Sequence, residues 1–247
     1  MTQNEATICP KCGFTQPGGP ECRRCGLIYA KYQRSRQPAH SVTFEPQAAT
    51  ADGGVPLLDL LLPPAREASR YILCFRGLLL LLLAIWGARL ALAGSASNAA
   101  GESLLHLVNL PFHEAGHVLC RPFGQFVTSL GGTLGQLLTP LACLLVLLLQ
   151  SRDPFGAAVC LWWFGENLLD IAPYIRDARA GALPLLGGNF GHSSPYGFHD
   201  WEYLLTETGL LRHDHLLASL AQFAGALLMA LALVWGGALL LRSLKRN

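Results

Sequence analysis

The sequence predicts a mainly α-helical, polytopic membrane protein with a small zinc-binding unit near its N-terminus. Of the 247 residues, 51% are hydrophobic and only 14% are charged, a balance typical of membrane proteins. Five apolar segments approach or reach the length of a membrane span, and two closely spaced cysteine pairs precede them. Together these observations predict four or five membrane helices that follow a Cys₄ zinc ribbon.

The ribbon is predicted by two Cys-x-x-Cys-Gly knuckles, formed by Cys9 with Cys12 and by Cys22 with Cys25. This doubled spacing is typical of a structural zinc site, in which four thiolates surround one ion. Two disulfides are the alternative, but a reducing cytosol disfavours them, and the segment has too few apolar residues to fold without a metal. We therefore predict a zinc ribbon over residues 1–36.

A stretch rich in Pro, Ala and Gly follows at residues 37–70 and predicts a linker, because no long helix or strand persists through such a sequence. Within it, residues 57–62 form a short apolar patch that either rests at the membrane interface or belongs to a partly ordered linker. The remaining residues, 71–247, are predicted to form the helical membrane domain.

Five apolar segments make up this domain. A span takes about twenty apolar residues, and the candidates are residues 72–93, 104–120, 130–149, 155–175 and 216–241. The second segment carries several polar side chains and Pro111, so we expect it to face protein or water. We favour four spans over five, with this segment broken at Pro111 or entering the membrane only partway.

Charge predicts the location and orientation. Basic residues before Tyr71 and in the tail at Arg242, Lys245 and Arg246 place both ends in the cytosol, and no secretory signal opens the chain. We expect a multi-pass protein of the cell membrane, with the lipid bilayer around it and a cytosolic partner for the ribbon. The net charge of +2, without a basic block, argues against nucleic-acid binding.

A His-Glu-Ala-Gly-His motif at 113–117 lies in the second segment. Residues four apart share a helix face, so His113 and His117 can bind one Zn²⁺ while Glu114 reaches the metal's water. Zinc lowers the pKa of this water, and Glu114 can take its proton as the general base. Unpaired polar groups on an apolar helix cost several kcal/mol of desolvation, which favours the metal site over an incidental pair of histidines.

A catalytic zinc takes three protein ligands and a water, so the histidine pair lacks one ligand. Asp170 in the fourth segment is our choice, with Glu166 and Asp177 as alternatives and a polar helix contact or a capping role as the non-ligand interpretation. Four further metal-competent groups follow a glycine-rich loop and are left unassigned, since such residues are more often interface residues or helix caps: His199, Asp200, His213 and His215.

Residues 104–177 resemble the site-2 protease family of intramembrane zinc metalloproteases. The resemblance rests on the motif at 113–117 with Pro122-Phe123-Gly124 after it, on Gly131-Gly132, and on an Asn-Leu-Leu sequence at 167–169 with an aspartate downstream. It implies hydrolysis of peptide bonds in membrane-embedded substrates, with Glu114 as general base and an aspartate of a later helix, Asp170, as third zinc ligand. It also implies that Asn167 hydrogen-bonds an unwound substrate strand.

A second hypothesis comes from a different class of protein. The chain could be a non-proteolytic zinc-binding membrane scaffold or sensor, in which the ribbon binds a cytosolic partner. Such a protein needs only the metal ligands, so the presence of Glu114 favours the metalloprotease.

Overall fold

The structure is a computed structural model that describes residues 6–29, 32, 56–64, 68–186 and 188–246. The chain divides into two compact units, Met1–Gly54 and Val55–Asn247, each of which is described here by itself. Most of the predicted linker at 37–70 lies outside the described residues. The described part is mainly helical, which confirms this part of the predicted fold class.

The first unit is a small ribbon built on one antiparallel strand pair. Strands β1 (Ala6–Ile8) and β2 (Thr15–Pro17) pair with Ile8 opposite Thr15. Each knuckle closes with a glycine whose amide donates to the carbonyl of the first cysteine of its pair, Gly13 to Cys9 and Gly26 to Cys22. Both glycines have a positive φ of 68° and 67°, which glycine adopts without a steric penalty.

The second unit consists of seven α-helices among the described residues. Their bounds are α2 Leu57–Leu61, α3 Arg70–Ala93, α4 Leu104–Cys120, α5 Gln125–Leu145, α6 Pro154–Arg176, α7 Asp200–Glu207 and α8 Asp214–Leu244. A π-helical turn, Val146–Gln150, extends α5. Three of the long helices begin at a side-chain cap that accepts a backbone N–H: Ser69 before α3, Ser103 before α4 and Asp153 before α6.

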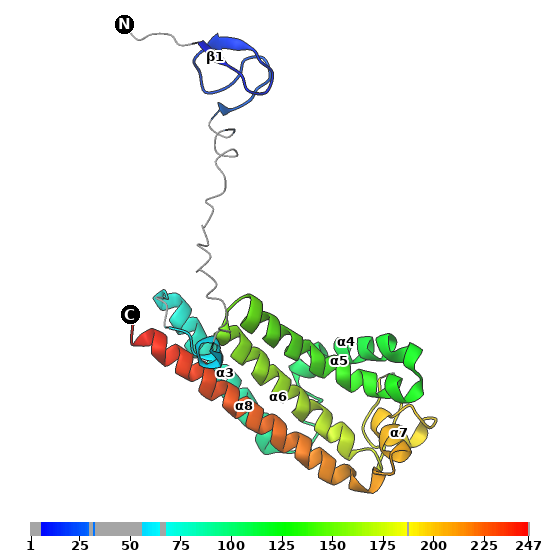
Figure 1. Cartoon of the computed structure of the whole chain (residues 1–247). Helices are drawn as coiled ribbons and strands as arrows, with labels where there is room; N and C mark the ends of the chain where they lie inside the picture. The colour runs from blue at the N-terminus through cyan, green and yellow to red at the C-terminus, as the bar shows by residue number, and fades with distance from the viewer. Residues whose placement is uncertain (1–5, 30–31, 33–55, 65–67, 187, 247) are drawn as a thin grey trace. The chain divides into compact units, whose positions relative to one another are not determined.

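Helices α3, α5, α6 and α8 lie side by side along the length of the unit (Figure 1). Helix α6 is the most enclosed of them. It packs closely on α8 at Gly165, where an added Cβ would lie only 2.7 Å from the Gly225 carbonyl oxygen. Helix α3, by contrast, is largely exposed, with apolar side chains facing outward. The polar residues of α6 are thereby kept inside the protein, while apolar surface faces outward.

Three helical segments are long and apolar enough to cross a membrane, Arg70–Ala93, Gln125–Gln150 and Leu211–Leu244. The predicted count of four or five spans is not settled by these criteria. Helix α4 has only 17 residues, and the apolar sequence of the continuous helix α6 contains the buried polar residues Glu166, Asn167 and Asp170. By length and composition, three helical segments could therefore cross a membrane.

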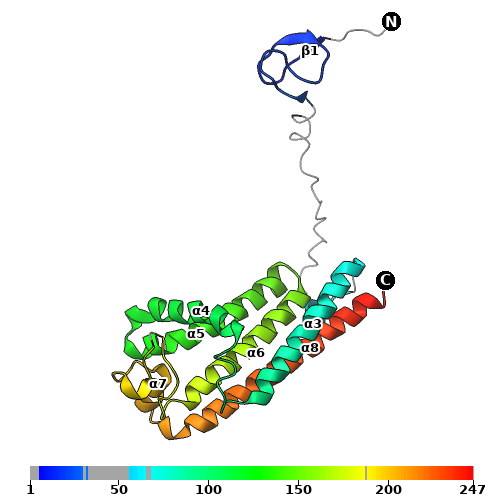
Figure 2. The ribbon, with the colours of Figure 1, turned by 180° about the vertical axis from the view of Figure 1, so that it is seen from behind.

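The direction of the helices bears on the topology. Helices α3 and α8 run antiparallel, so the start of α3 and the end of α8 lie at the same end of the bundle in both views (Figures 1 and 2). Helix α4 is shorter and packs along part of α5. It is not broken at Pro111, because the helix continues through this proline.

The apolar patch at 57–62 is an ordered part of this unit. Helix α2 packs near the C-terminal part of α8, where the Trp235 indole donates to the Leu61 carbonyl at 2.7 Å and Arg242 donates to the Leu62 carbonyl at 2.8 Å. Leu57 and Leu58 stay exposed. The structure therefore favours a docked amphipathic turn over a partly ordered linker.

Candidate metal centres

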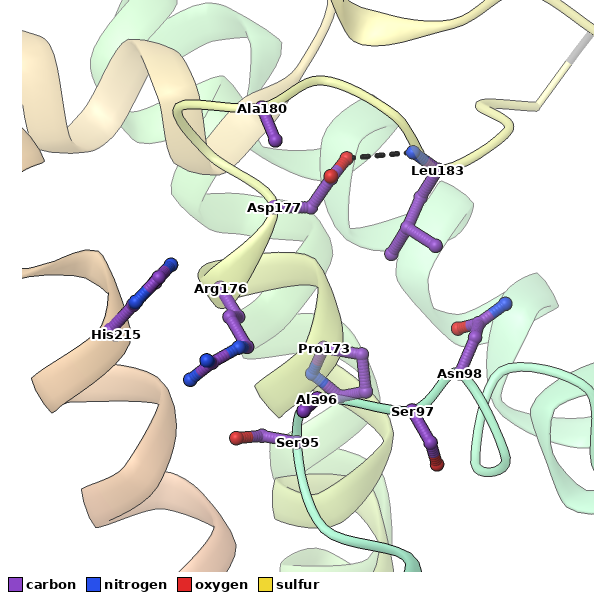
Figure 3. A pocket seen from close by; sticks show the side chains of 10 residues that line it. All are labelled: Ser95, Ala96, Ser97, Asn98, Pro173, Arg176, Asp177, Ala180, Leu183 and His215. Atoms are coloured by element: carbon purple, nitrogen blue, oxygen red, sulfur yellow. Dashed lines mark hydrogen bonds between the residues drawn. The ribbon is translucent and has the colours of Figure 1, made fainter.

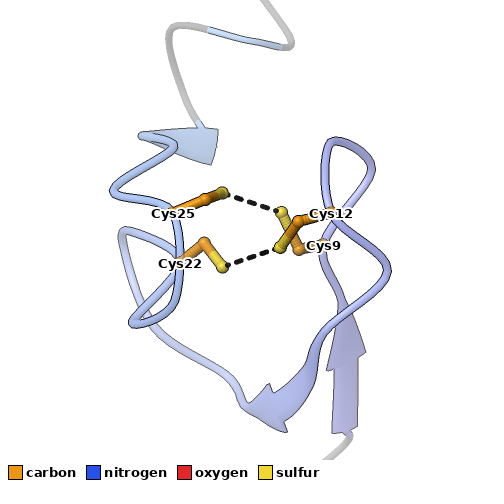
Figure 4. Close-up of side chains that lie close together, drawn as sticks. All are labelled: Cys9, Cys12, Cys22 and Cys25. Atoms are coloured by element: carbon orange, nitrogen blue, oxygen red, sulfur yellow. Dashed lines mark hydrogen bonds between the residues drawn. The ribbon is translucent and has the colours of Figure 1, made fainter.

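The four ribbon cysteines converge at one point (Figure 4). The Sγ atoms of Cys9 and Cys25 lie 3.6 Å apart and those of Cys12 and Cys22 lie 3.7 Å apart, and all four thiols are free. A tetrahedron with Zn–S bonds of about 2.3 Å has edges of about 3.8 Å. The cluster could therefore hold one metal ion, and the alternative of two disulfides is not what the structure contains.

The local backbone also favours the thiolate form of Cys22. Burial acts to raise the pKa of the Cys22 thiol, but N–H groups of Cys25 and Arg24 donate to its sulfur and lower its pKa to about 6. Gln16 joins the two halves of the ribbon, since its amide donates to the Glu21 carbonyl and accepts from the Arg23 N–H. These contacts pre-arrange the knuckles around the sulfur cluster.

A second cluster of ligand atoms forms around the motif at 113–117. His113 and His117 lie on one face of α4, with ring centroids 4.7 Å apart. The Oδ2 atom of Asp200, at the start of α7, lies 3.3 Å from Nε2 of each histidine. A tetrahedron with bonds of about 2.0 to 2.1 Å has edges of about 3.3 to 3.4 Å. These three groups could hold a metal ion.

Hydrogen bonds fix which ring nitrogen of each histidine is free. His117 Nδ1 lies 2.7 Å from the Thr128 carbonyl oxygen, which can only accept, so Nδ1 carries the proton. His113 Nδ1 lies 2.6 Å from Gln136 Oε1 and donates to it in the same way. In the neutral rings both Nε2 atoms therefore present lone pairs toward the Asp200 carboxylate. Three electron-pair donors facing one another fit a cation between them.

Glycine in α5 leaves the space that such a cation needs. A Cβ added at Gly132 would collide with Nε2 of both His113 and His117. Gly131 and Gly135 meet the α4 backbone at similarly short range, so α4 and α5 cross closely at this level. The glycines thus bring the two helices together and keep the region beside the imidazoles open.

Asp200 is held in place by its neighbours. His199 caps α7, since its Nδ1 accepts the Glu202 N–H at 3.2 Å, and its ring stacks on Tyr174 with centroids 4.2 Å apart. The Asp200 N–H donates to the Tyr174 hydroxyl at 3.0 Å. Burial acts to raise the pKa of Asp200, but the facing rings of His113 and His117 outweigh it when they carry a proton on Nε2, and they hold this pKa below its usual value. The carboxylate therefore stays ionised.

The predicted third ligand, Asp170, lies outside this cluster. Its carboxylate bonds to His106 Nδ1 at 2.9 Å, to the Asn109 amide at 3.1 Å and to the Gln136 amide at 3.4 Å. Gln136 stands between Asp170 and His113, bonding to both. Asp170 thus supports the histidine through Gln136, and the acid that lies beside both histidines is Asp200.

The two alternatives to Asp170 also lie outside the histidine cluster. Glu166 is completely buried and accepts from the Asn109 amide at 3.0 Å. Asp177 accepts the backbone N–H groups of Ala182 and Leu183, each at 2.9 Å, and so shapes the loop after α6. Neither carboxylate meets the His113 and His117 pair.

Asn167, predicted to bind a substrate strand, faces the interior of the protein. It is fully buried, its Oδ1 accepts from the Gln136 amide at 3.1 Å, and its Nδ2 donates to the Trp163 carbonyl at 3.0 Å. Both ends of the side chain are occupied, and it does not line the cavity described next. Its role in the structure is to orient Gln136, which in turn orients His113.

A cavity of about 540 Å³ opens beside the histidine cluster. Glu114 and the three ligand residues line it, and so do His106 and Asp170 further along α4 and α6. The connection from α6 to α7 covers one side through residues 183–186, where an isolated antiparallel bridge pairs Pro184 with Phe190. The general-base candidate and the candidate metal ligands therefore share one space.

Comparisons of the chain with protein-family models, curated proteins and solved structures found no match. The case for a function therefore rests on the residues and their geometry. The sequence did show Asp200 beside His199 after a glycine-rich loop, but the same pattern fits a simple helix start. Only the packing of α7 against α5 and α6 brings Asp200 to the histidines.

Proposed function

We propose that this chain is a membrane-embedded zinc metalloprotease that hydrolyses peptide bonds of membrane proteins. His113, His117 and Asp200 would hold the catalytic zinc, and the four ribbon cysteines would hold a second, structural zinc. The observation that carries the proposal is the convergence of three ligand atoms at tetrahedral spacing, with both Nδ1 protons already committed elsewhere.

The residues of the cavity supply the rest of the chemistry. When bound, a zinc ion in a three-ligand site lowers the pKa of a coordinated water and polarises a carbonyl group. Glu114 follows His113 on α4 and lines the same cavity, so its carboxylate is placed to accept the proton of the attacking water. It can then return this proton to the leaving amine.

A membrane-embedded substrate suits the surroundings of the site. Helix α4 carries the motif and also exposes Leu107, Val118 and Leu119, while Leu110 and Ile171 line the cavity itself. An unwound peptide segment reaching Glu114 would meet apolar side chains such as Leu110 and Ile171 beside the polar groups of the candidate metal site. This favours a peptide segment drawn from the bilayer over a hydrophilic peptide.

We further propose four spans with both ends in the cytosol. The support is the positive charge at both ends of the sequence and the antiparallel course of α3 and α8. A cysteine added after Asn247 in a background without native cysteines should stay unlabelled by an impermeant thiol reagent applied from outside. Labelling in intact cells would replace this topology with an odd number of crossings.

Replacement of the general base tests the enzymatic proposal. Membranes from cells that express wild type or Glu114→Gln should differ in their peptide termini, with internal cleavage products of membrane proteins only in wild type. Glu102→Gln, in an exposed carboxylate of the α3–α4 connection, is the matched control and should cleave like wild type. Zinc content should be equal in all three proteins.

The same experiment separates the two classes of function. A scaffold or sensor would bind zinc but give identical peptide termini in wild type and Glu114→Gln. Cleavage that persists in Glu114→Gln would mean that another residue, or another protein, performs the hydrolysis. Both outcomes reject the proposed enzyme, and only loss of cleavage with retained zinc supports it.

A further inference from the structure

A second, smaller pocket of about 200 Å³ lies where α6 ends and α8 begins (Figure 3). Its walls come from the α3–α4 connection, the last turn of α6 and the first turn of α8. The polar side chains that line it are Ser95, Ser97, Asn98, Arg176, Asp177 and His215. None of them serves the proposed zinc site, although Asn98 and Leu183 border both cavities.

Arg176 is the central charge of this pocket. Within the described part of the chain, no residue forms a hydrogen bond or ion pair with its half-buried guanidinium. The neighbouring Arg179 differs, because it donates to the buried Asp214 carboxylate at 2.7 Å. A guanidinium presents a fork of N–H donors that suits planar or tetrahedral oxyanions. The pocket thus contains an unmatched cation with its donors available.

The other groups around Arg176 are donors as well. In Figure 3 its guanidinium lies in the region between His215 of α8 and Ser95 of the α3–α4 connection. The Ser95 residue is buried, and its hydroxyl has no hydrogen-bond partner among the residues that the structure describes. The one acid, Asp177, already accepts two backbone N–H groups at 2.9 Å, so its oxygens are engaged.

From this geometry we infer that the pocket binds one phosphate group, on a lipid headgroup or as free phosphate, through Arg176, Ser95 and His215. The pocket lies at the level where α3 ends and where the apolar segment Leu211–Leu244 begins. Headgroup phosphates of either leaflet lie near the ends of membrane helices, and the donor fork of an arginine suits a phosphate group. The inference is independent of the proposed hydrolysis.

Native mass spectrometry of the full-length protein in detergent tests the inference. The protein is offered equal amounts of phosphatidylglycerol and diacylglycerol, which share their tails but differ in the phosphate. Wild type should retain phosphatidylglycerol about tenfold better, and Arg176→Gln should lose this preference. Arg212→Gln, an exposed arginine of the same end of α8, is the matched control and should behave like wild type.

Added inorganic phosphate separates the two sources of the ligand. If inorganic phosphate binds to wild type but not to Arg176→Gln, and phosphatidylglycerol shows no such dependence, the ligand is free phosphate. The assigned phosphate chemistry then stands. An unchanged lipid preference in Arg176→Gln, or equal loss in Arg212→Gln, would show diffuse surface charge and overturn the site.

Thermal unfolding of each variant guards against a folding defect. If Arg176→Gln unfolds, Ser95→Ala and His215→Ala provide the test, since each keeps the arginine and removes one donor. Each should weaken the phosphate preference severalfold. If neither variant changes it, the inference is wrong.

Discussion

The two ligand clusters of this protein are built in opposite ways. In the ribbon, Cys9 and Cys25 are separated by 16 positions, and two short turns bring all four thiols together. In the second unit, Val55–Asn247, Asp200 follows His113 by 87 positions, and three helices must pack before these side chains meet. A local cluster can be recognised from spacing alone, whereas a tertiary cluster depends on the fold that assembles it.

The cost of losing the metal should differ accordingly. The described part of the ribbon has a short strand pair and a few buried residues, so a bound metal would supply most of its folding free energy. The second unit is held together by apolar contacts between its helices, which do not involve a metal ion. Its metal site should therefore empty without unfolding the helices.

The largest effect is expected from removing metal from the ribbon. Structural zinc supplies about 10 to 16 kcal/mol in small zinc domains, more than such a unit can replace. A peptide of residues 1–36 should show dispersed amide signals with Zn²⁺ and collapse to an unfolded spectrum in EDTA under reducing conditions. Equal order with and without zinc would show that the ribbon folds by its own packing.

The next effect concerns the identity of the third ligand. In a protein that lacks residues 1–36, Asp200→Ala should reduce bound zinc from about one equivalent per chain to none, because two imidazoles leave the ion's charge uncompensated. Asp170→Ala is the matched control and should retain the metal. Elemental analysis after gel filtration measures both. Loss in Asp170→Ala with retention in Asp200→Ala would restore the assignment made from sequence.

Features that depend on neighbouring residues can be predicted from the sequence. The convergence of the four cysteines, the proximity of His113 and His117 and the helical class all follow from short spacings and apolar runs. The acid that lies beside the histidines does not, because three acids in α6 or just after it, Glu166, Asp170 and Asp177, had the right chemistry and no spacing rule chose among them. Hydrogen bonds in the folded protein engage all three elsewhere.

Asn167 shows a related limit of sequence reasoning. An asparagine near a predicted site suggests a contact with substrate, yet a side chain on α6 can as well face inward. The burial of α6 by its neighbours decides the matter, since Asn167 bonds to Gln136 and Trp163. A polar residue in an apolar helix therefore identifies an important position without revealing its partner.

A loss of zinc as large as that in Asp200→Ala is expected from filling the space beside the histidines. Gly132→Ala should prevent zinc binding to the second unit, because the added Cβ would meet Nε2 of both His113 and His117. Gly237→Ala adds the same methyl group to α8, where the position is open, and should bind zinc normally. Helix content by circular dichroism should be equal in both. Full zinc occupancy in Gly132→Ala would mean that the metal lies elsewhere.

The smallest effect is expected from removing the side chain that hydrogen-bonds to the candidate ligand His113. Gln136 accepts the His113 Nδ1 proton at 2.6 Å and is itself oriented by Asn167 and Asp170. Removing such a partner typically weakens metal affinity by about 10 to 100-fold, since the ring loses its fixed orientation and tautomer. Gln136→Ala should therefore still bind zinc but release it to a competing chelator at a lower chelator concentration than wild type.

Thr139→Ala is the matched control three residues further along α5, where the hydroxyl donates to the Gly135 carbonyl. If both Gln136→Ala and Thr139→Ala keep the zinc affinity of wild type, the hydrogen bond from His113 to Gln136 does not affect metal binding. Asp170 and Asn167, which contact His113 only through Gln136, would then have no influence on the metal either.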